Sequence, residues 1–293
     1  MPMPTFTHLR TCSGYSFLHG ASQPDELVTR AAELDMPRLG LTDRDGLHGA
    51  VRFAKACLRD GVAPIVGVDL ALVPDEWAPP RQPSAARGGE ARDLRLPRVT
   101  AWAASRAGWS DLCALVTAAH AAGRGAPRVT PALLGRHCAG HDVVVGMGAD
   151  SPTGRLVAAG RLADAVADLT SWRDALGEGI AVAITNHHAP GRGVASAHQA
   201  AGLLRAAERA EVPCVATNMV RMARRDQAPT CDVLDASRRR VPLRAGNIDR
   251  ANAEGHLKDA AGMRYAVEEA ARLVGADAGR VLGATEALSL IHI

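Results

Sequence analysis

The feature that most constrains the fold of this 293-residue chain is a repeated alternation of short apolar runs with helical patterns. Residues 6–9 and 38–42 are predicted strands, and between them Pro24 opens a helix, because proline suits a first helical turn. A second helix over 49–59 is predicted to end at Gly61, since glycine best tolerates the backbone of a helix end. Such alternation is typical of βα units around a parallel sheet.

The same alternation continues through most of the chain. Further strands are predicted at 64–72, 142–146, 179–185 and 212–217. At least six βα-like repeats favour a barrel or a doubly wound sheet, and in both architectures ligands bind at the carboxyl ends of the strands. Residues 74–97, rich in proline, glycine and arginine, are predicted to form a mobile surface loop. After Asn218 the strand pattern fades, and helices are predicted over 231–240 and 256–274.

Composition narrows the class of protein without giving its function. Hydrophobic residues make up 47% and charged residues 22%, which is ordinary globular usage and excludes a disordered or collagen-like chain. No apolar run reaches the roughly 20 residues that a membrane span needs, and residues 1–10 do not resemble a secretory signal, so a cytoplasmic protein is predicted. The six cysteines form no CxxC pair, which favours buried thiols over a zinc knuckle or a disulfide framework.

Polar motifs at the predicted strand ends resemble a known family. They occupy residues 8–13, 15–22, 41–54 and 64–69. Together they resemble the PHP (polymerase and histidinol phosphatase) domain, in the form found at the front of bacterial family C DNA polymerases, the replicative alpha subunit and its error-prone relative. Residues 99–123, 129–134 and 215–218 extend this resemblance, and residues 252–258 resemble the opening of the polymerase core.

The resemblance implies an α/β fold, a distorted (β/α)7 barrel of the PHP type over residues 1–236. Residues 237–287 would then be the helical, incomplete start of the polymerase core. Residues 288–293 break the preceding helical pattern and match the in-frame translation of a transposase adapter used in sequencing libraries. They are therefore expected to be an artefact, with a terminal apolar strand as the alternative.

In active members of the family, His, Asp, Glu and Cys side chains hold up to three metal ions that activate water for phosphoester hydrolysis. The resemblance places the nine corresponding positions at Arg10, Cys12, His19, Arg44, Asp69, Arg98, Met147, Met219 and Arg221. Four are arginines, whose guanidinium stays protonated and offers no lone pair. At about 4 Å and an effective dielectric of ~20, one such charge would oppose a divalent ion by roughly 8 kcal/mol. We therefore expect a degenerate site with no metal and no catalytic residue.

Two arrangements could replace the metal ions. The first is an ion-pair network at the barrel mouth that takes over their cross-linking role, because unpaired buried charge is costly. The second is an anion pocket, since planar guanidinium groups suit a phosphate. Both would use the same residues, Arg10, Arg44, Arg98, Arg221, Asp43, Asp45 and Asp69.

By resemblance, the parent protein is a DNA-directed DNA polymerase, a nucleotidyltransferase that extends a primer on a template with dNTPs and Mg²⁺. Its catalytic palm carboxylates would lie beyond residue 287, so this fragment is expected to lack activity and to need no cofactor. Its expected role is structural, bracing the polymerase core and contacting replication or lesion-bypass proteins, with no membrane partner.

Two alternatives remain. A metal-dependent PHP phosphoesterase, such as a histidinol-phosphate phosphatase or a 3′–5′ nuclease, would need a working metal cluster. An anion-binding or interaction module unrelated to replication would leave the 252–258 match unexplained. His187 and His188 could be paired ligands, although a solvated loop is the simpler interpretation. The basic clusters at 221–225 and 238–240 suit either a nucleic-acid backbone or a docking contact with the polymerase.

Overall fold

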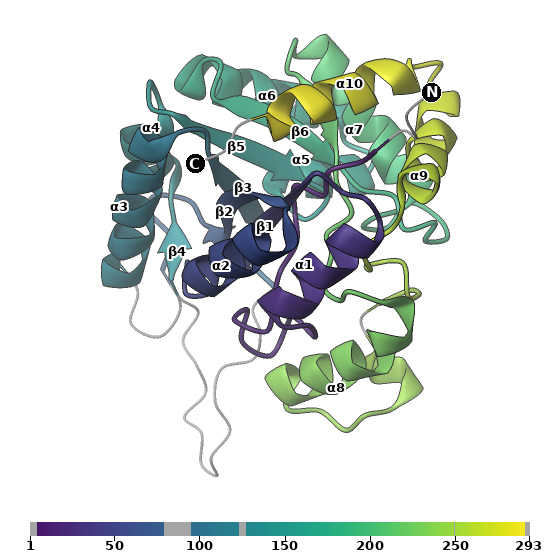
Figure 1. The fold of residues 1–293 in the computed structure, drawn as a ribbon. Coiled ribbons are helices and arrows are strands. Elements are labelled where there is room, and N and C mark those ends of the chain that lie inside the picture. The colour runs from purple at the N-terminus through teal and green to yellow at the C-terminus, as the bar shows by residue number, and fades with distance from the viewer. Residues whose placement is uncertain (1–4, 79–94, 123–126, 249, 291–293) are drawn as a thin grey trace, which may run out of the picture.

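A curved sheet of seven strands organises the computed structural model, which describes residues 5–78, 95–122, 127–248 and 250–290 (Figure 1). Its strands are β1 (Arg38–Arg44), β2 (Ala63–Leu72), β3 (Arg98–Ala103), β4 (Arg128–Val129), β5 (Val143–Gly148), β6 (Ile180–Ile184) and β7 (Cys214–Ala216). They follow the order β1-β2-β3-β5-β6-β7, and β4 pairs with β2. The predicted strands after residue 38 are confirmed within a few residues at each end.

The sheet is not entirely parallel, which corrects the prediction. Strand β3 runs antiparallel to both of its neighbours, β2 and β5, whereas the other pairs are parallel. A parallel pair needs a long crossover connection, usually a helix, whereas antiparallel strands can be joined directly. The connection between β2 and β3 carries the predicted surface loop 74–97, of which residues 79–94 lie outside the described part of the chain.

Residues 6–12 bring the two edges of the sheet together. On one side the N–H groups of Gly40 and Thr42 in β1 donate to the carbonyls of His8 and Thr11, each at 2.7 Å. On the other side Cys12 N–H donates to Val220 O at 2.9 Å, and Val220 N–H donates to Arg10 O at 3.0 Å. Residues 6–9, predicted as the first strand, form no regular strand, and the segment has only an isolated bridge at Thr11. The expected α/β barrel class is nevertheless confirmed, because the sheet curls into a barrel-like form.

Apolar side chains fill the inside of the curved sheet. Trp102 is fully buried there with Leu9 and Ile65, and its indole N–H donates to Leu9 O at 2.8 Å. Gly146 makes room for this ring, because a Cβ at that position would lie 2.5 Å from it. A larger core lies between the sheet and its covering helices, so most strands are buried on both faces.

The helices are α1 (Pro24–Glu33), α2 (Ala50–Asp60), α3 (Arg106–Ala122), α4 (Pro131–Cys138), α5 (Pro152–Ala158), α6 (Leu162–Leu176), α7 (Ala197–Arg209), α8 (Ala228–Arg239), α9 (Ala260–Arg272) and α10 (Ala278–Ser289). Gly61 follows α2 with a φ of 72°, which confirms it as the end of that helix. Among the described residues, no helix combines the length and apolarity needed to cross a membrane.

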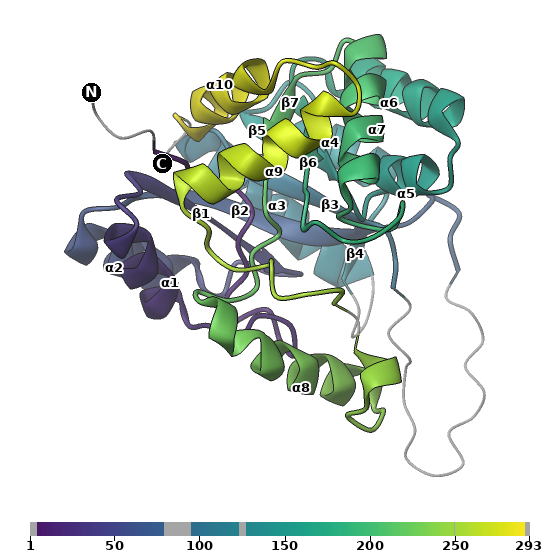
Figure 2. The same ribbon diagram turned by 90° about the vertical axis from the view of Figure 1, so that its right-hand side faces the viewer.

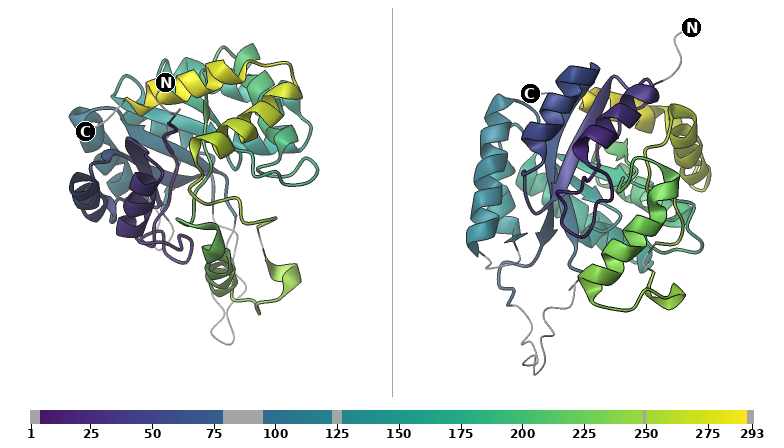
Figure 3. Two further views of the ribbon diagram at one scale, coloured as in Figure 1. Left: turned by 45° about the vertical axis from the view of Figure 1, so that its right-hand side comes forward. Right: turned by 60° about the horizontal axis from the view of Figure 1, so that its bottom comes forward.

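Helix α8 projects from the body, whereas α9 and α10 lie against it (Figures 2 and 3). Met263, Val267 and Val281 belong to the same core as the strands. The expected domain boundary at residue 236 remains a prediction, although the last two helices pack with the rest of the chain. Leu288 and Ser289 lie in α10, and residues 291–293 are outside the described residues.

Candidate functional site

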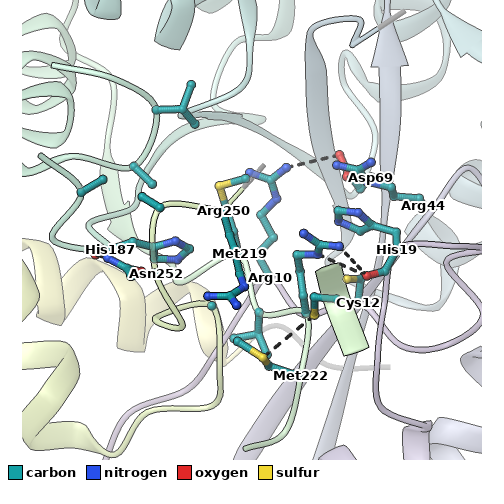
Figure 4. A pocket seen from close by; sticks show the side chains of 18 of the residues that line it. Arg10, Cys12, His19, Arg44, Asp69, His187, Met219, Met222, Arg250 and Asn252 are labelled. Carbon is teal, nitrogen blue, oxygen red and sulfur yellow. Dashed lines mark hydrogen bonds and ion pairs between the residues drawn. The ribbon is translucent and has the colours of Figure 1, made fainter. Parts of the chain in front are cut away.

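Polar side chains from several elements meet at one end of the barrel, around a cavity of about 220 Å³ (Figure 4). Arg10 comes from the edge-joining segment, Arg44 ends β1, and Asp69 faces Arg44 in the register of β1 with β2. Arg98 is the first residue of β3. Because β3 is antiparallel, its beginning lies at the edge where β1 and β2 end.

Asp69 joins three of the four predicted arginines. Its carboxylate accepts a hydrogen bond from Arg98 Nε at 3.0 Å and lies 3.4 Å from both Arg10 Nη2 and Arg44 Nε. Arg98 Nη2 also donates to the Asp69 carbonyl and to Asp45 Oδ1, each at 2.7 Å. The side chain of Asp69 is only 6% exposed, so these contacts lie in a poorly solvated site.

A carboxylate that the sequence interpretation missed completes this cluster. Asp150, in the turn after β5, accepts two hydrogen bonds from the Arg10 guanidinium, both at 2.9 Å. Its carbonyl also accepts the backbone N–H of Arg98 at 3.1 Å. The available signal was its position, since Asp150 follows the predicted strand 142–146 by four residues, much as Asp45 follows the predicted strand 38–42.

Burial and ion pairing act in opposite directions on these charges. Burial disfavours the cation of Arg10, but the carboxylates of Asp150 and Asp69 outweigh it and raise the pKa of Arg10. The pKa of Arg98 is likewise raised against burial, by Asp69 and Asp45. Both arginines are therefore held as cations by the carboxylates around them.

Asp43 does not join the arginines, contrary to expectation. Its carboxylate accepts the Ser13 backbone N–H at 2.7 Å and the hydroxyl groups of Ser13 and Ser16 at 3.0 and 2.8 Å. Adjacent residues of a strand point to opposite faces, so Asp43 and Arg44 separate. Burial raises the pKa of Asp43, while the hydrogen bonds from the serines oppose that shift. Asp43 therefore holds the loop of residues 13–16 against β1.

Arg221 belongs to a second ion-pair group. Its guanidinium donates two hydrogen bonds to Asp235, at 2.9 and 2.8 Å, and two to the His19 carbonyl, at 3.2 and 3.0 Å. Arg238 also contacts Asp235, at 2.8 Å, and the Asp235 side chain is only 1% exposed. The sequence interpretation missed Asp235, although it stands three residues before Arg238 on a predicted helix. This group ties α8 to the loop that carries His19.

The remaining predicted positions offer few metal-binding groups. Burial raises the pKa of Cys12 to about 12, so its thiol is protonated at neutral pH. Burial and the nearby charges of Arg221 and Arg44 hold the pKa of His19 well below its usual value. Met147 is fully buried in the core, whereas Met219 lines the cavity.

This donor set does not fit a divalent cation. Asp69 already contacts three arginines, Cys12 is a neutral thiol, and the ring of His19 lies 3.2 Å from Arg238 Nη1. Within the described ranges, no three His, Cys, Asp or Glu side chains form a group that could hold a metal ion. What the arrangement can do chemically is cross-link the barrel and attract anions.

His187 and His188 do not act as a pair. His187 Nε2 contacts Asn218 O at 2.7 Å, while His188 Nδ1 contacts Glu269 of α9 at 2.5 Å. The two rings therefore reach different elements. Both lie in a loop, as the simpler interpretation expected, but they are only half-exposed and each contacts protein atoms.

Comparison with known proteins identifies the family. The model of the PHP domain matches residues 8–187, more than half of the sequence. The chain belongs to the PHP domain family. Within the described residues, this match includes the Asp69 cluster with Arg10, Arg44, Arg98 and Asp150, whereas Arg221 and α8 lie beyond it.

Relatives of this PHP domain include two bacterial polymerases. DNA polymerase III subunit alpha of Caulobacter vibrioides is 33% identical over 221 residues, which cover 75% of this chain and 18% of that protein. The error-prone DNA polymerase of Anaeromyxobacter dehalogenans (strain 2CP-1 / ATCC BAA-258) is 36% identical over 261 residues, covering 87% of this chain and 20% of the relative. The chain thus spans about a fifth of the length of each.

Among solved structures, an amidohydrolase from Chromobacterium violaceum is similar with a TM-score of 0.47 and 15% sequence identity. That similarity covers 72% of this chain and 86% of the amidohydrolase.

Proposed function

We propose that this chain is the PHP domain of a family C DNA polymerase, of the alpha-subunit or error-prone type, and that it acts as a metal-free structural module. The full-length protein would be a cytoplasmic DNA-directed DNA polymerase that uses template-primer DNA, dNTPs and Mg²⁺ in replication, repair or lesion bypass. The PHP domain would brace the polymerase core and contact replication or lesion-bypass proteins. Identities of 33% and 36% to two such polymerases support this assignment.

One observation carries the structural role. Arg10, Arg44 and Arg98 stand at positions where active PHP domains are expected to hold metal ligands, and all three contact the carboxylate of Asp69. These residues come from the edge-joining segment and from β1, β2 and β3, so the cluster links four parts of the barrel. Ion pairs here would perform the cross-linking that metal ions perform elsewhere in the family.

The alternative of a metal-dependent phosphoesterase or 3′–5′ nuclease has less support. Hydrolysis of that kind requires a cation to activate water. The described donor set instead places guanidinium groups around the one acidic candidate ligand, Asp69. No contact in the described residues favours this second function.

Metal content distinguishes the metal-free structural role from a metal-dependent hydrolytic one. The purified chain is incubated with Mn²⁺ or Zn²⁺, freed of excess ion by dialysis, and analysed for bound metal. We expect far less than one ion per chain, and no turnover of a phosphomonoester or of single-stranded DNA. One or more stoichiometric ions, or turnover that Asp69→Ala abolishes, would contradict the structural role.

Replacing the shared carboxylate tests the bracing role directly. We expect Asp69→Asn to lower the free energy of unfolding by about 3–5 kcal/mol, because it leaves the buried guanidinium of Arg10 and the partly buried ones of Arg44 and Arg98 less compensated. Urea unfolding followed by circular dichroism measures this change. Asp164→Asn is the matched control, since Asp164 pairs with Arg161 at the surface and is 52% exposed. Equal effects of the two variants would show that the Asp69 cluster does not brace the barrel.

A further inference from the structure

The cavity at the barrel mouth is lined by more cations than anions. Its arginines are Arg10, Arg44, Arg221 and Arg250. Asp69 is the only carboxylate among the described residues that line it. The other main partners of the lining arginines, Asp150, Asp235 and Asp232, are not part of the cavity wall. The wall therefore presents excess positive charge to whatever enters.

Arg44 is the least compensated of these cations. Its Nε is buried and finds no hydrogen-bond acceptor among the described residues. The nearest carboxylate oxygen, Asp69 Oδ2, lies 3.4 Å away and accepts a hydrogen bond from Arg98 at 3.0 Å. Burial, together with the charge of Arg98, lowers the pKa of Arg44 to about 10, whereas the pKa of Arg10 is raised. A buried cation without a full partner is costly, and a bound anion would offset that cost.

The form of the cavity indicates the class of anion. A guanidinium group offers parallel N–H donors that match two oxygens of a phosphate group. Apolar side chains of Val194, Met219 and Met222 line other parts of the same cavity, which suits an organic group attached to that phosphate. Figure 4 shows Arg44 and His19 on the side of Asp69, with His187 and Asn252 across the cavity. The room between them, about 220 Å³, exceeds that of a single water molecule several-fold.

We propose that this cavity binds a phosphate monoester group, with Arg44 as its principal ligand and Arg10 and Arg221 contributing positive charge. The inference rests on the proposed function, in which the barrel mouth holds no metal ion, because a metal cluster would occupy the same positions. The shared chemistry is the phosphate itself, carried by a small molecule or by the end of a DNA strand. Binding would involve no covalent step.

Isothermal titration calorimetry of the 293-residue chain tests this site. The probes are inorganic phosphate, deoxyadenosine 5′-monophosphate, and a short single-stranded oligodeoxynucleotide with or without a 5′-phosphate, all at one ionic strength set by NaCl. We expect saturable binding of at least one phosphate probe and at least tenfold weaker binding to Arg44→Gln. The matched control is Arg205→Gln, on the exposed surface of α7 outside the cavity wall, which should bind like the unsubstituted chain.

The probes separate the sources of the phosphate. Oligonucleotide binding that requires the 5′-phosphate would assign the site to a DNA end, whereas binding of only the small probes would assign it to a phosphorylated small molecule. Absence of saturable binding by every probe, or unchanged affinity in Arg44→Gln, would overturn the proposal.

A second variant keeps the test decisive if Arg44→Gln does not fold. Arg44→Lys keeps the charge but loses the planar fork, so its affinity should lie between those of the unsubstituted chain and Arg44→Gln. If Arg44→Gln does not fold, an Arg44→Lys affinity equal to that of the unsubstituted chain would overturn the proposal. Metal content is measured separately, so failure of phosphate binding would leave the structural role standing.

Discussion

The role of each charged residue at the barrel mouth depends on its hydrogen-bond partners as much as on its own chemistry. Asp69 and Asp43 are both buried carboxylates near the ends of neighbouring strands, yet Asp69 binds arginines and Asp43 binds serines. The difference follows from the alternation of side chains along β1, which directs Asp43 away from the cavity and Arg44 toward it. Residue type alone did not separate these two roles.

Buried His8 provides a pH-dependent prediction at the same scale. Its Nε2 contacts the Lys258 carbonyl at 3.0 Å, and burial lowers its pKa to about 4. Between pH 6.5 and about 4, the unfolded chain binds a proton at this histidine that the folded chain does not. The free energy of unfolding should therefore fall as the pH is lowered through this range, by about 3 kcal/mol from His8.

Urea unfolding at pH 7 and pH 4.5 measures that dependence. In His8→Gln, the loss of stability between the two pH values should be smaller by about 2–3 kcal/mol. His198→Gln, at an exposed position of α7, should keep the dependence of the unsubstituted chain. Identical pH dependence in His8→Gln and the unsubstituted chain would mean that His8 does not carry this linkage.

At the scale of elements, the segment of residues 6–12 decides whether the sheet curls into a barrel. Its backbone bonds to β1 on one side and to Val220 beyond β7 on the other, although it has almost no regular strand pairing. Its close approach to β1 depends on Gly40, since a Cβ there would lie 2.5 Å from Leu9 O. The same segment carries Arg10 and Cys12, so the residues that close the barrel also line the cavity.

We therefore expect Gly40→Ala to lower the free energy of unfolding by about 1–3 kcal/mol, because the clash is with backbone that cannot rotate away. Thermal and urea unfolding measure the loss. Gly135→Ala, within α4, is the control, since nothing lies within 4 Å of a Cβ at that position. This change should be neutral or stabilising by up to about 1 kcal/mol, because alanine suits a helix interior better than glycine. Comparable losses from both substitutions would contradict the role of Gly40 in closure.

At the scale of the whole molecule, the C-terminal helices share the core of the barrel. Met263 and Val267 of α9 and Val281 of α10 are buried with residues of the sheet and of α7. Thr285 of α10 also accepts the backbone N–H of Ala216 at 2.8 Å. Helix α8 is tied to the barrel mouth through Asp235. Helices α9 and α10 thus pack into the core of the barrel, while the domain boundary at residue 236 stays a prediction.

Removing α9 and α10 should accordingly destabilise the rest of the protein. Chain 1–259 loses the burial of these apolar side chains, each worth about 1.5–3 kcal/mol when fully buried. We expect a lower melting temperature or aggregation, measured by differential scanning calorimetry and size-exclusion chromatography. Chain 1–289, which keeps both helices, is the control. Unchanged stability of chain 1–259 would support an independent domain before residue 260.

The sequence alone determined the regular elements and the chemistry of individual positions. Hydrophobic periodicity is local, so it located strands β1, β2, β5, β6 and β7 and helices α1, α2, α8 and α9, but it did not identify β3 or β4. Gly61 marked the end of α2 for a local backbone reason. Motifs at strand ends also gave the PHP family, which the family match to residues 8–187 confirms. The expectation that arginines replace metal ligands also came from the sequence and stays a prediction.

Only the tertiary structure decided how those positions combine. The antiparallel course of β3 brings Arg98 to the end of the sheet where Asp69 lies, and periodicity does not report strand direction. Asp150 and Asp235 reach arginines that are 140 and 14 residues away in the chain. Ion pairs depend on distances in space, which are set by strand order, sheet curvature and barrel closure rather than by any local pattern.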